Sequence, residues 1–412
     1  MRSKGLKRLS IIILLICLLG GVALSSSTSR VSYTVSVEAQ YELRDVPVSA
    51  VVPLPGVPYK SVVLKTKAGQ IVPHQCEYAS DGVRVTWMIR HLKKGERQQY
   101  TVVFTKEAIP LARDAVKVVQ SDESVNIRIN GLPFMNYVFK GAPKPYCYPI
   151  FGPNKIAVTR GYPMDAIPGE DTDHPHHRSL WFTHGDVNGI DFWGESPQAG
   201  RIVHRKFDAL ENGPVYGRIV AVNDWVTRDG KKVCEDRREI RVYNALSCRM
   251  MDIEVTVRAT DSPVRFGDTK EGTFGIRVAS WMDADKGGEI LNSRGDRGAE
   301  AWGKQADWCD YFGKIGNDMV GIAVLEHPSS FRHPTYWHVR TYGLFAANPF
   351  GLRDFRKDKT LDGSYTIPPG GEITFRYRIV IHKGDADKAG IASAYLAYAE
   401  QPTVSVVKCS ED

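Results

Sequence analysis

Residues 218–258 read RIVAVNDWVTRDGKKVCEDRREIRVYNALSCRMMDIEVTVR and decide the fold class. Asp229-Gly230 lies between two runs of alternating hydrophobic and polar residues, 218–226 and 232–243, and this dipeptide is typical of a β-hairpin turn. In a third run, residues 250–258, hydrophobic side chains fall on one face and polar side chains on the other. The stretch therefore predicts three neighbouring antiparallel strands with one buried face.

The turn between the second and third strands also bears on the cysteines. We expect a hairpin turn at residues 244–247, which would place Tyr243 opposite Cys248. Cys234 would then fall opposite Val257, so Cys234 and Cys248 would not be bridged to each other.

The cysteines outside the first 25 residues are widely spaced and form no CxxC pair. In an oxidising compartment they could form disulfides, and buried free thiols are the alternative. These cysteines are Cys76, Cys147, Cys234, Cys248, Cys309 and Cys409.

Two β-rich regions follow one another along the chain. Between residues 32 and 105, short alternating runs are separated by glycine turns such as Lys67-Ala68-Gly69. This pattern predicts a small β-sandwich over residues 30–106. Residues 106–114 form a linker, and residues 115–400 are interpreted as a large antiparallel β-sandwich.

One helix is predicted near the C-terminal end. Asp385 or Asp387 can cap a run whose hydrophobic residues have helical spacing, and Pro402 ends that run. We expect this helix to pack across a sheet and residues 403–412 to form a frayed tail. The predicted fold class is mostly β: a small sandwich, a large antiparallel sandwich, and a short C-terminal helix.

The N-terminal segment has the order of a secretory signal peptide. Four basic residues precede an apolar run, residues 11–24, which is shorter than the roughly 20 residues that span a bilayer. We expect cleavage near Ser25, which removes residues 1–25 and lowers the formal net charge from +7 to +3. The protein is therefore expected to be secreted or periplasmic, with no membrane association after cleavage. Without a basic stripe, nucleic acid is not an expected partner.

Histidines are concentrated in one short segment. Residues 173–186 read DHPHHRSLWFTHGD, and four of the 11 histidines of the chain lie there. A core strand would not carry so many polar rings, because each needs a hydrogen-bond partner when buried. The segment, followed by Asp191-Phe192-Trp193-Gly194-Glu195, is therefore predicted to line a site.

Two further segments place charged and aromatic residues beside glycine or proline. They are Asp268–Arg277 and His333–Arg340, the second continuing to Asn348-Pro349-Phe350-Gly351. Such composition is typical of ligand-facing strand ends and loops. The alternative for each segment is a satisfied polar strand at a sheet edge.

These motifs, together with Ala301-Trp302-Gly303-Lys304 and Trp308-Cys309-Asp310-Tyr311, resemble a family catalogued as methane oxygenase PmoA. The resemblance covers about residues 120–351. The membrane enzyme of that name needs several transmembrane helices, which this sequence lacks after its signal peptide. The family otherwise has no settled activity, and its members look like exported proteins of bacteria that degrade polysaccharides.

A sugar ligand suits the side chains of these segments. Tryptophans could stack on pyranose faces, while charged and amide groups could bind ring hydroxyls. The predicted substrate-binding residues are His174, His176, Arg178, Trp181, Asp191, Trp193, Glu195, Arg277, Trp337, His338, Arg340 and Asn348.

The predicted chemistry is general acid and base catalysis. The architecture is similar, at fold level, to galactose mutarotase-like sandwiches, in which a histidine acts as the acid and a glutamate as the base. We expect His177 or His184 to donate a proton and Glu271 to abstract one, with Arg178 or Arg277 stabilising negative charge. Epimerisation, β-elimination and hydrolysis all fit this description.

Two alternatives stay open. His174, His176 and His184 could hold a divalent metal, although no cofactor is expected on the main reading. The large sandwich could also be a glycan-binding protein without catalysis, since stacking tryptophans serve both roles.

Overall fold

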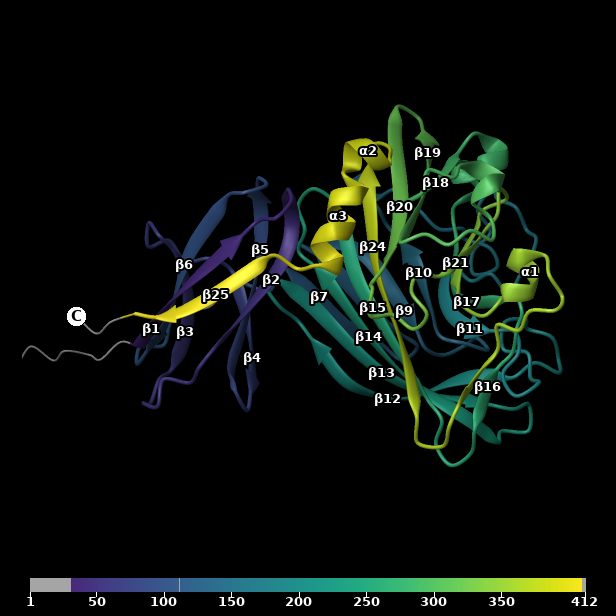
Figure 1. Ribbon diagram of the computed structural model, residues 1–412, viewed down its shortest axis with the longest axis horizontal. Helices are drawn as coiled ribbons and strands as arrows, with labels where there is room; N and C mark the ends of the chain where they lie inside the picture. Colours follow the sequence, from purple (N-terminus) through teal and green to yellow (C-terminus); the bar gives the residue numbers. More distant parts are fainter. Residues whose placement is uncertain (1–30, 111, 410–412) are drawn as a thin grey trace, which may run out of the picture.

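The computed structural model describes residues 31–110 and 112–409, which form two β-sandwiches (Figure 1). Their strands pair antiparallel, so the predicted mostly β fold class is confirmed. The predicted signal peptide, residues 1–25, lies outside the described residues. Within the described part of the chain, no helix has the length and apolar character needed to cross a membrane.

The small sandwich consists of a four-stranded and a three-stranded sheet around its own core. In spatial order, the first sheet contains β25 (Thr403–Lys408), β1 (Val31–Glu38), β6 (Arg97–Thr105) and β3 (Ser61–Thr66). The second contains β2 (Leu43–Val52), β5 (Gly82–Leu92) and β4 (His74–Ala79).

The large sandwich consists of two eight-stranded sheets, which we call the front sheet and the back sheet. In spatial order, the front sheet contains β21 (Tyr336–Val339), β22 (Leu344–Asn348), β17 (Gly272–Arg277), β11 (Leu180–His184), β10 (Tyr146–Ile150), β9 (Leu132–Val138), β8 (Ser124–Ile129) and β7 (Val116–Gln120). The back sheet contains β12 (Arg201–Glu211), β13 (Tyr216–Val226), β14 (Lys232–Tyr243), β15 (Arg249–Arg258), β24 (Glu372–Lys383), β20 (Asp318–Glu326), β19 (Trp308–Ile315) and β18 (Glu289–Asn292). A two-stranded ribbon pairs β16 (Val264–Phe266) with β23 (Tyr365–Ile367).

Helices are short and peripheral. The α-helices are α1 (Leu352–Arg356), α2 (Ala386–Ala389) and α3 (Ile391–Ala399). The single-turn 3-10 helices are Pro153–Lys155, Ser280–Met282, Ala284–Lys286 and Gly298–Ala301.

The predicted C-terminal helix is confirmed as α2 and α3. The Asp385 side chain caps α2 by accepting a hydrogen bond from the backbone N–H of Lys388. Ile391 of α3 packs in one cluster with Leu325 of β20 and Val380 of β24, so the helix covers the back sheet as expected (Figure 1).

The frayed tail expected over residues 403–412 is wrong for residues 403–408, which form β25. This strand pairs with β1 in the register Val35↔Val406, beside the N-terminal strand in Figure 1. Val404 and Val406 pack against the small core. Without β25, the backbone of β1 would present an unpaired edge, so the pairing satisfies polar groups that the sequence pattern did not reveal.

The hairpin predicted around Asp229-Gly230 is confirmed by β13 and β14, but the register of the next turn was predicted wrongly. Tyr243 pairs with Met250, not with Cys248. The turn is longer because the small sandwich holds it: the Asp45 carboxylate accepts hydrogen bonds from the backbone N–H groups of Leu246, at 2.9 Å, and Ser247, at 2.6 Å. The cysteines of the described residues are free thiols.

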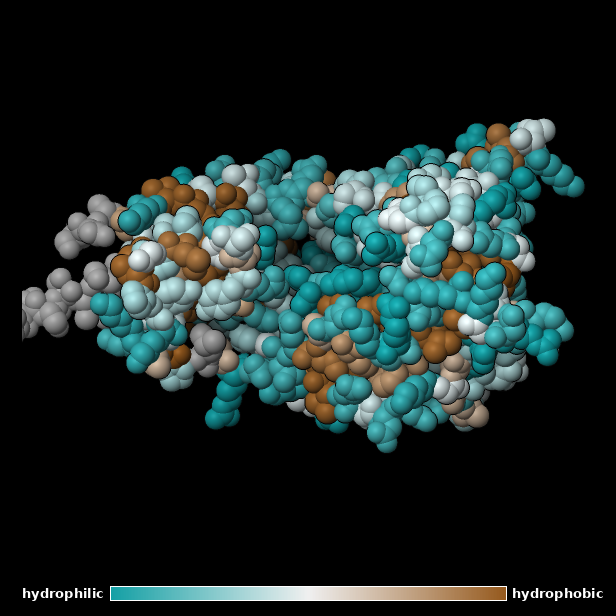
Figure 2. All heavy atoms as spheres, turned by 90° about the horizontal axis from the view of Figure 1, so that it is seen from below, coloured by the Kyte–Doolittle hydropathy of each residue, from teal (hydrophilic) through white to brown (hydrophobic). Residues whose placement is uncertain are grey.

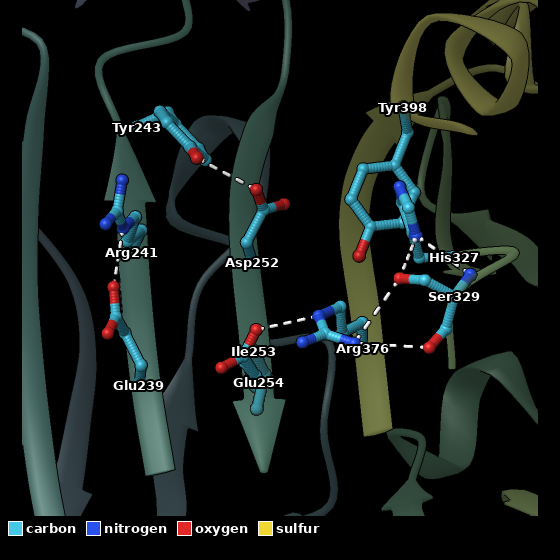
Figure 3. Close-up of a pocket in the computed structure, with 10 residues that line it drawn as sticks. All are labelled: Glu239, Arg241, Tyr243, Asp252, Ile253, Glu254, His327, Ser329, Arg376 and Tyr398. Carbon is cyan, nitrogen blue, oxygen red and sulfur yellow. Dashed lines mark hydrogen bonds and ion pairs between the residues drawn. The ribbon is translucent and has the colours of Figure 1, made fainter. Parts of the chain in front are cut away.

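Solvent-facing charges on the back sheet form cross-strand ion pairs. Glu239 accepts hydrogen bonds from Arg218, Arg237 and Arg241 at 2.7–2.9 Å. Glu239 and Arg241, together with the pair Glu254–Arg376 at 2.8 Å, line a pocket of 440 Å³ on this sheet (Figure 3). The charged groups of this pocket therefore satisfy one another. The face of the molecule seen from below is also mainly hydrophilic, with separate hydrophobic patches (Figure 2).

Glu239 provides a test of these cross-strand ion pairs. Burial alone would raise the pKa of Glu239, but hydrogen bonds and charge from Arg218 and Arg241 lower it from 4.5 to about 2. E239Q should reduce the free energy of unfolding at pH 7 by about 1–3 kcal/mol, because three guanidinium groups lose their shared anion.

The carboxylate contributes fully above pH 4.5, so the difference between wild type and E239Q should shrink as the pH falls from 4.5 towards 2. Urea unfolding at several pH values measures this difference in the free energy of unfolding. E289Q is the control, because Glu289 and Arg297 form an exposed pair that should contribute little. A constant difference over that pH range would contradict the assignment.

Candidate functional site

The outer face of the front sheet carries a cluster that we call the aromatic floor. It contains Tyr146, Trp181, Trp193, Leu344 and Ala346. The indole of Trp181 lies over Gly275 on the neighbouring strand, where a Cβ atom would stand only 2.7 Å from the ring. Only glycine at position 275 leaves room for that ring.

The histidine-rich loop before β11 folds over this floor. The ring of His177 stacks on Trp181, with centroids 5.3 Å apart and planes inclined by 18°. His174 lies between His177 and Tyr342, nearly parallel to both, at 4.7 and 5.3 Å. The backbone of His174 is left-handed, with φ of 44°, a conformation that costs about 1–3 kcal/mol and needs support from its surroundings.

Asp173 supplies that support. Its carboxylate accepts a hydrogen bond from Nη2 of Arg277 at 2.7 Å, and it also contacts Arg160 and His174. Burial alone would raise the pKa of Asp173, but the hydrogen bond from His174 and the charges of the two arginines lower it to about 2. Asp173 is therefore ionised and ties the loop to the front sheet.

His177 is held as a neutral imidazole. Its Nδ1 lies 3.3 Å from Nη1 of Arg277. A guanidinium only donates hydrogen bonds, so Nδ1 is the acceptor and carries no proton. Burial and the charges of His176 and Arg277 lower the pKa of His177 well below 6.5.

A second network fixes residues 191–195 beside the floor. Glu195 forms a bidentate ion pair with Arg178, with both distances 2.7 Å. The buried ammonium of Lys144 lies 3.1 Å from the same carboxylate and donates to the carbonyl of Trp193 at 2.8 Å. Burial lowers the pKa of Lys144 to about 8. Asp191 accepts hydrogen bonds from the backbone N–H groups of Trp193 and Gly194 and so shapes the turn.

Glu271, directly before β17, lies next to a third network. Its carboxylate accepts a hydrogen bond from Nζ of Lys270 at 2.7 Å. Burial alone would raise the pKa of Glu271, but Lys270, His338 and His176 together lower it. The carboxylate is about one third exposed and therefore accessible to a ligand.

His338 is neutral with its proton on Nδ1. That nitrogen donates to the carbonyl of Lys270 at 2.7 Å, and Nε2 accepts from Nε of Arg340 at 3.3 Å. Burial lowers the pKa of His338 to about 4. With both ring nitrogens engaged, His338 positions Arg340 and the loop that carries Glu271.

His176 differs from the other histidines of the site. No hydrogen bond to its ring nitrogens occurs in the part of the chain that the structure describes. Burial, Lys144 and His174 lower the pKa of His176 to about 4, while Glu195 and Glu271 oppose this shift. Glu271 and His176 thus influence one another's ionisation.

Of three further predicted site residues, two lie in the core and one forms hydrogen bonds with backbone groups. His184 faces the core between the sheets, where Nε2 is 2.8 Å from the carbonyl of Gly267. Trp337 is fully buried and donates to the carbonyl of Ala306. Asn348 donates to the carbonyl of Thr269 and accepts from the N–H group of Phe350. Strand alternation causes the first two outcomes, because these residues fall on the inner face.

The predicted stacking tryptophans are not available to a ligand in this structure. Trp181 is 1% exposed, Trp193 2% and Trp337 0%. Tyr342 and Trp302 are instead the partly exposed rings beside the site. Trp302 lies in the motif Ala301-Trp302-Gly303-Lys304, which was a usable signal, whereas nothing in the sequence marks Lys144 or Tyr342.

The three predicted metal ligands do not converge. His174 and His176 have ring centroids 5.7 Å apart, but His184 lies on the core face of β11. Among residues 31–110 and 112–409, no three His, Cys, Asp or Glu side chains are arranged to hold a metal ion.

Comparison with known proteins identifies a family. The family described as "Family of unknown function (DUF6807)" matches residues 124–396. No curated protein matches the chain. The PmoA resemblance stays a prediction.

Solved structures similar to the chain include a protein in glycosyl hydrolase family 38 from Enterococcus faecalis, with TM-score 0.41, and an alpha-mannosidase from Enterococcus faecalis V583, with TM-score 0.43. Both are 10% identical to this chain and cover 92% of it. The chain spans about half their length, at 47% and 46%.

The ionisation of the site can be measured directly. In the folded protein, the rings of His176 and His338 should titrate near pH 4, and in urea near the ordinary value of about 6.5. The unfolded chain therefore binds protons first, so these groups remove stability as the pH falls from about 6.5 to 4.

NMR of the imidazole Cε1–H groups, assigned with H176N and H338N, checks this expectation. A folded-state titration near pH 6.5 for either ring would show that its burial is incomplete.

Proposed function

This chain belongs to the DUF6807 family, whose function is unknown, and we propose that it is an exported carbohydrate-active protein. Its front-sheet site would bind a sugar or glycoside and perform acid-base chemistry on it. The observation that carries the proposal is the pair of Glu271, an accessible carboxylate, and His176, an imidazole without a hydrogen-bond partner among the described residues.

The protonation states favour one direction of proton transfer. At neutral pH, Glu271 is ionised and His176 is neutral, because the pKa of each lies below its ordinary value. Both groups are therefore ready to accept a proton. Reactions that begin with removal of a carbon-bound proton, such as epimerisation or β-elimination, fit this state better than hydrolysis, which needs a protonated acid at the leaving oxygen.

Roles for the neighbouring groups follow from their contacts. Arg340, positioned by His338, presents a guanidinium that would stabilise negative charge developing on a substrate oxygen. The exposed part of Tyr342 and the donors of Lys270 would orient the sugar. Arg178 and Arg277 are each engaged with a carboxylate and therefore hold the loops in place.

The roles proposed from sequence change accordingly. Glu271 remains the proposed base. His176 replaces His177 and His184 as the proposed partner, because Arg277 occupies one nitrogen of His177 and His184 lies in the core.

The test is a proton NMR time course with oligosaccharides, free aldoses and oxidised glycosides. Loss of a C–H signal, or exchange of its proton for deuterium from the solvent, should accompany turnover. E271Q and H176N should each lower turnover by about 100-fold or more while ligand affinity changes by less than about threefold.

H91N and E289Q are matched controls, since His91 lies on the small sandwich and Glu289 at the surface of the back sheet. Binding without any turnover by wild type would favour a glycan-binding protein. Full turnover by E271Q would remove Glu271 from the mechanism.

A further inference from the structure

A second cavity lies at the edge of the front sheet, and we call it the edge pocket. Its volume is 770 Å³, within the range of small-ligand sites. Trp302, Tyr336 and Phe355 form its aromatic part, with Tyr336 and Phe355 stacked at 5.5 Å and 20°.

The edge pocket is positively charged. It is lined by Arg294, Lys304, Arg356 and Lys357 against two acidic residues, Asp296 and Glu300, which leaves a surplus of two positive charges. None of the four basic side chains forms an ion pair within the described part of the chain. In the 440 Å³ pocket on the back sheet, in contrast, charged side chains form ion pairs with one another (Figure 3).

The edge pocket is continuous with the front-sheet site through Trp302. The guanidinium of Arg340 lies 4.9 Å above the Trp302 ring, and His338 meets the ring at 6.3 Å. His338 in turn hydrogen-bonds the carbonyl of Lys270, next to Glu271. Arg340 itself has no carboxylate partner among the described residues, so an uncompensated cation stands at the junction.

From these contacts we infer that the edge pocket is a subsite for an acidic oligosaccharide that extends from the front-sheet site. This inference rests on the proposed function and names its substrate class. A sugar ring stacks on Trp302 or Tyr336, and a carboxylate of the chain binds Lys304 and Arg356. Arg340 binds a carboxylate of the sugar unit that lies over Glu271.

An acidic substrate also suits the proton chemistry. A carboxylate attached to the reacting carbon makes its C–H proton more acidic once a cation neutralises the carboxylate. Arg340 is placed to do so beside the base. A neutral sugar would leave the surplus positive charge of the edge pocket, and the guanidinium of Arg340, without an anionic partner.

The test measures binding of two tetrasaccharides, oligogalacturonate and oligomannuronate, against their methyl esters. Calorimetry should show at least one acid form binding about tenfold or more tightly than its ester, with affinity falling as salt rises. K304E/R356E should weaken that binding by about tenfold or more. K314E/K231E, which makes the same charge change at exposed positions outside the edge pocket, should leave it within about twofold.

Different failures point to different parts of the argument. Equal binding of acids and esters, or unchanged binding by K304E/R356E with a native melting curve, overturns the subsite. Binding of the acid form by wild type without any turnover removes the proposed acid-base function and leaves the subsite standing. E271Q should bind the acid form as wild type does. If wild type turns the substrate over and K304E/R356E has the same KM, the subsite is overturned and the proposed acid-base function stands.

Discussion

Side-chain alternation along β11 and β17 is the constraint on which the site depends. Successive residues of a strand point to opposite faces, so β11 sends Phe182 and His184 into the core and Trp181 to the outer face. Gly275 on β17 makes room for the indole of Trp181. A register shift of one residue would exchange these faces, so the core and the site come from the same pattern.

On this scaffold, charges have two different uses. Buried Arg277 is engaged by the partly exposed Asp173, and Arg178 by Glu195, and these pairs hold the loops over the aromatic floor. Removing Asp173 or Glu195 would leave a guanidinium that is largely buried without its anion, which destabilises the fold. Arg340 rests on Trp302 without an acidic partner in the described residues. The first group builds the site, and Arg340 is available to a ligand.

The small sandwich is built from both ends of the described chain. β25 completes the sheet of β1, and Asp45 of β2 holds the turn after β14, so each sandwich constrains the other. Met88 of the small sandwich also packs with Tyr216 and Met250 of the large one. This arrangement explains why strand pairing at residues 403–408 needs a partner more than 360 positions away in the chain, as in Val37↔Val404.

The sequence by itself determined the β architecture, the hairpin at Asp229-Gly230 and the terminal helix, because these depend on local alternation, turn chemistry and capping. It also marked the segments around His176, Glu271 and His338 as candidates for a site. Tertiary structure alone decided which of their side chains meet. Burial and partner geometry sent His184 inward, enclosed the predicted stacking tryptophans and brought Lys144 and Tyr342 to the candidate site, since such contacts join segments that are distant in sequence.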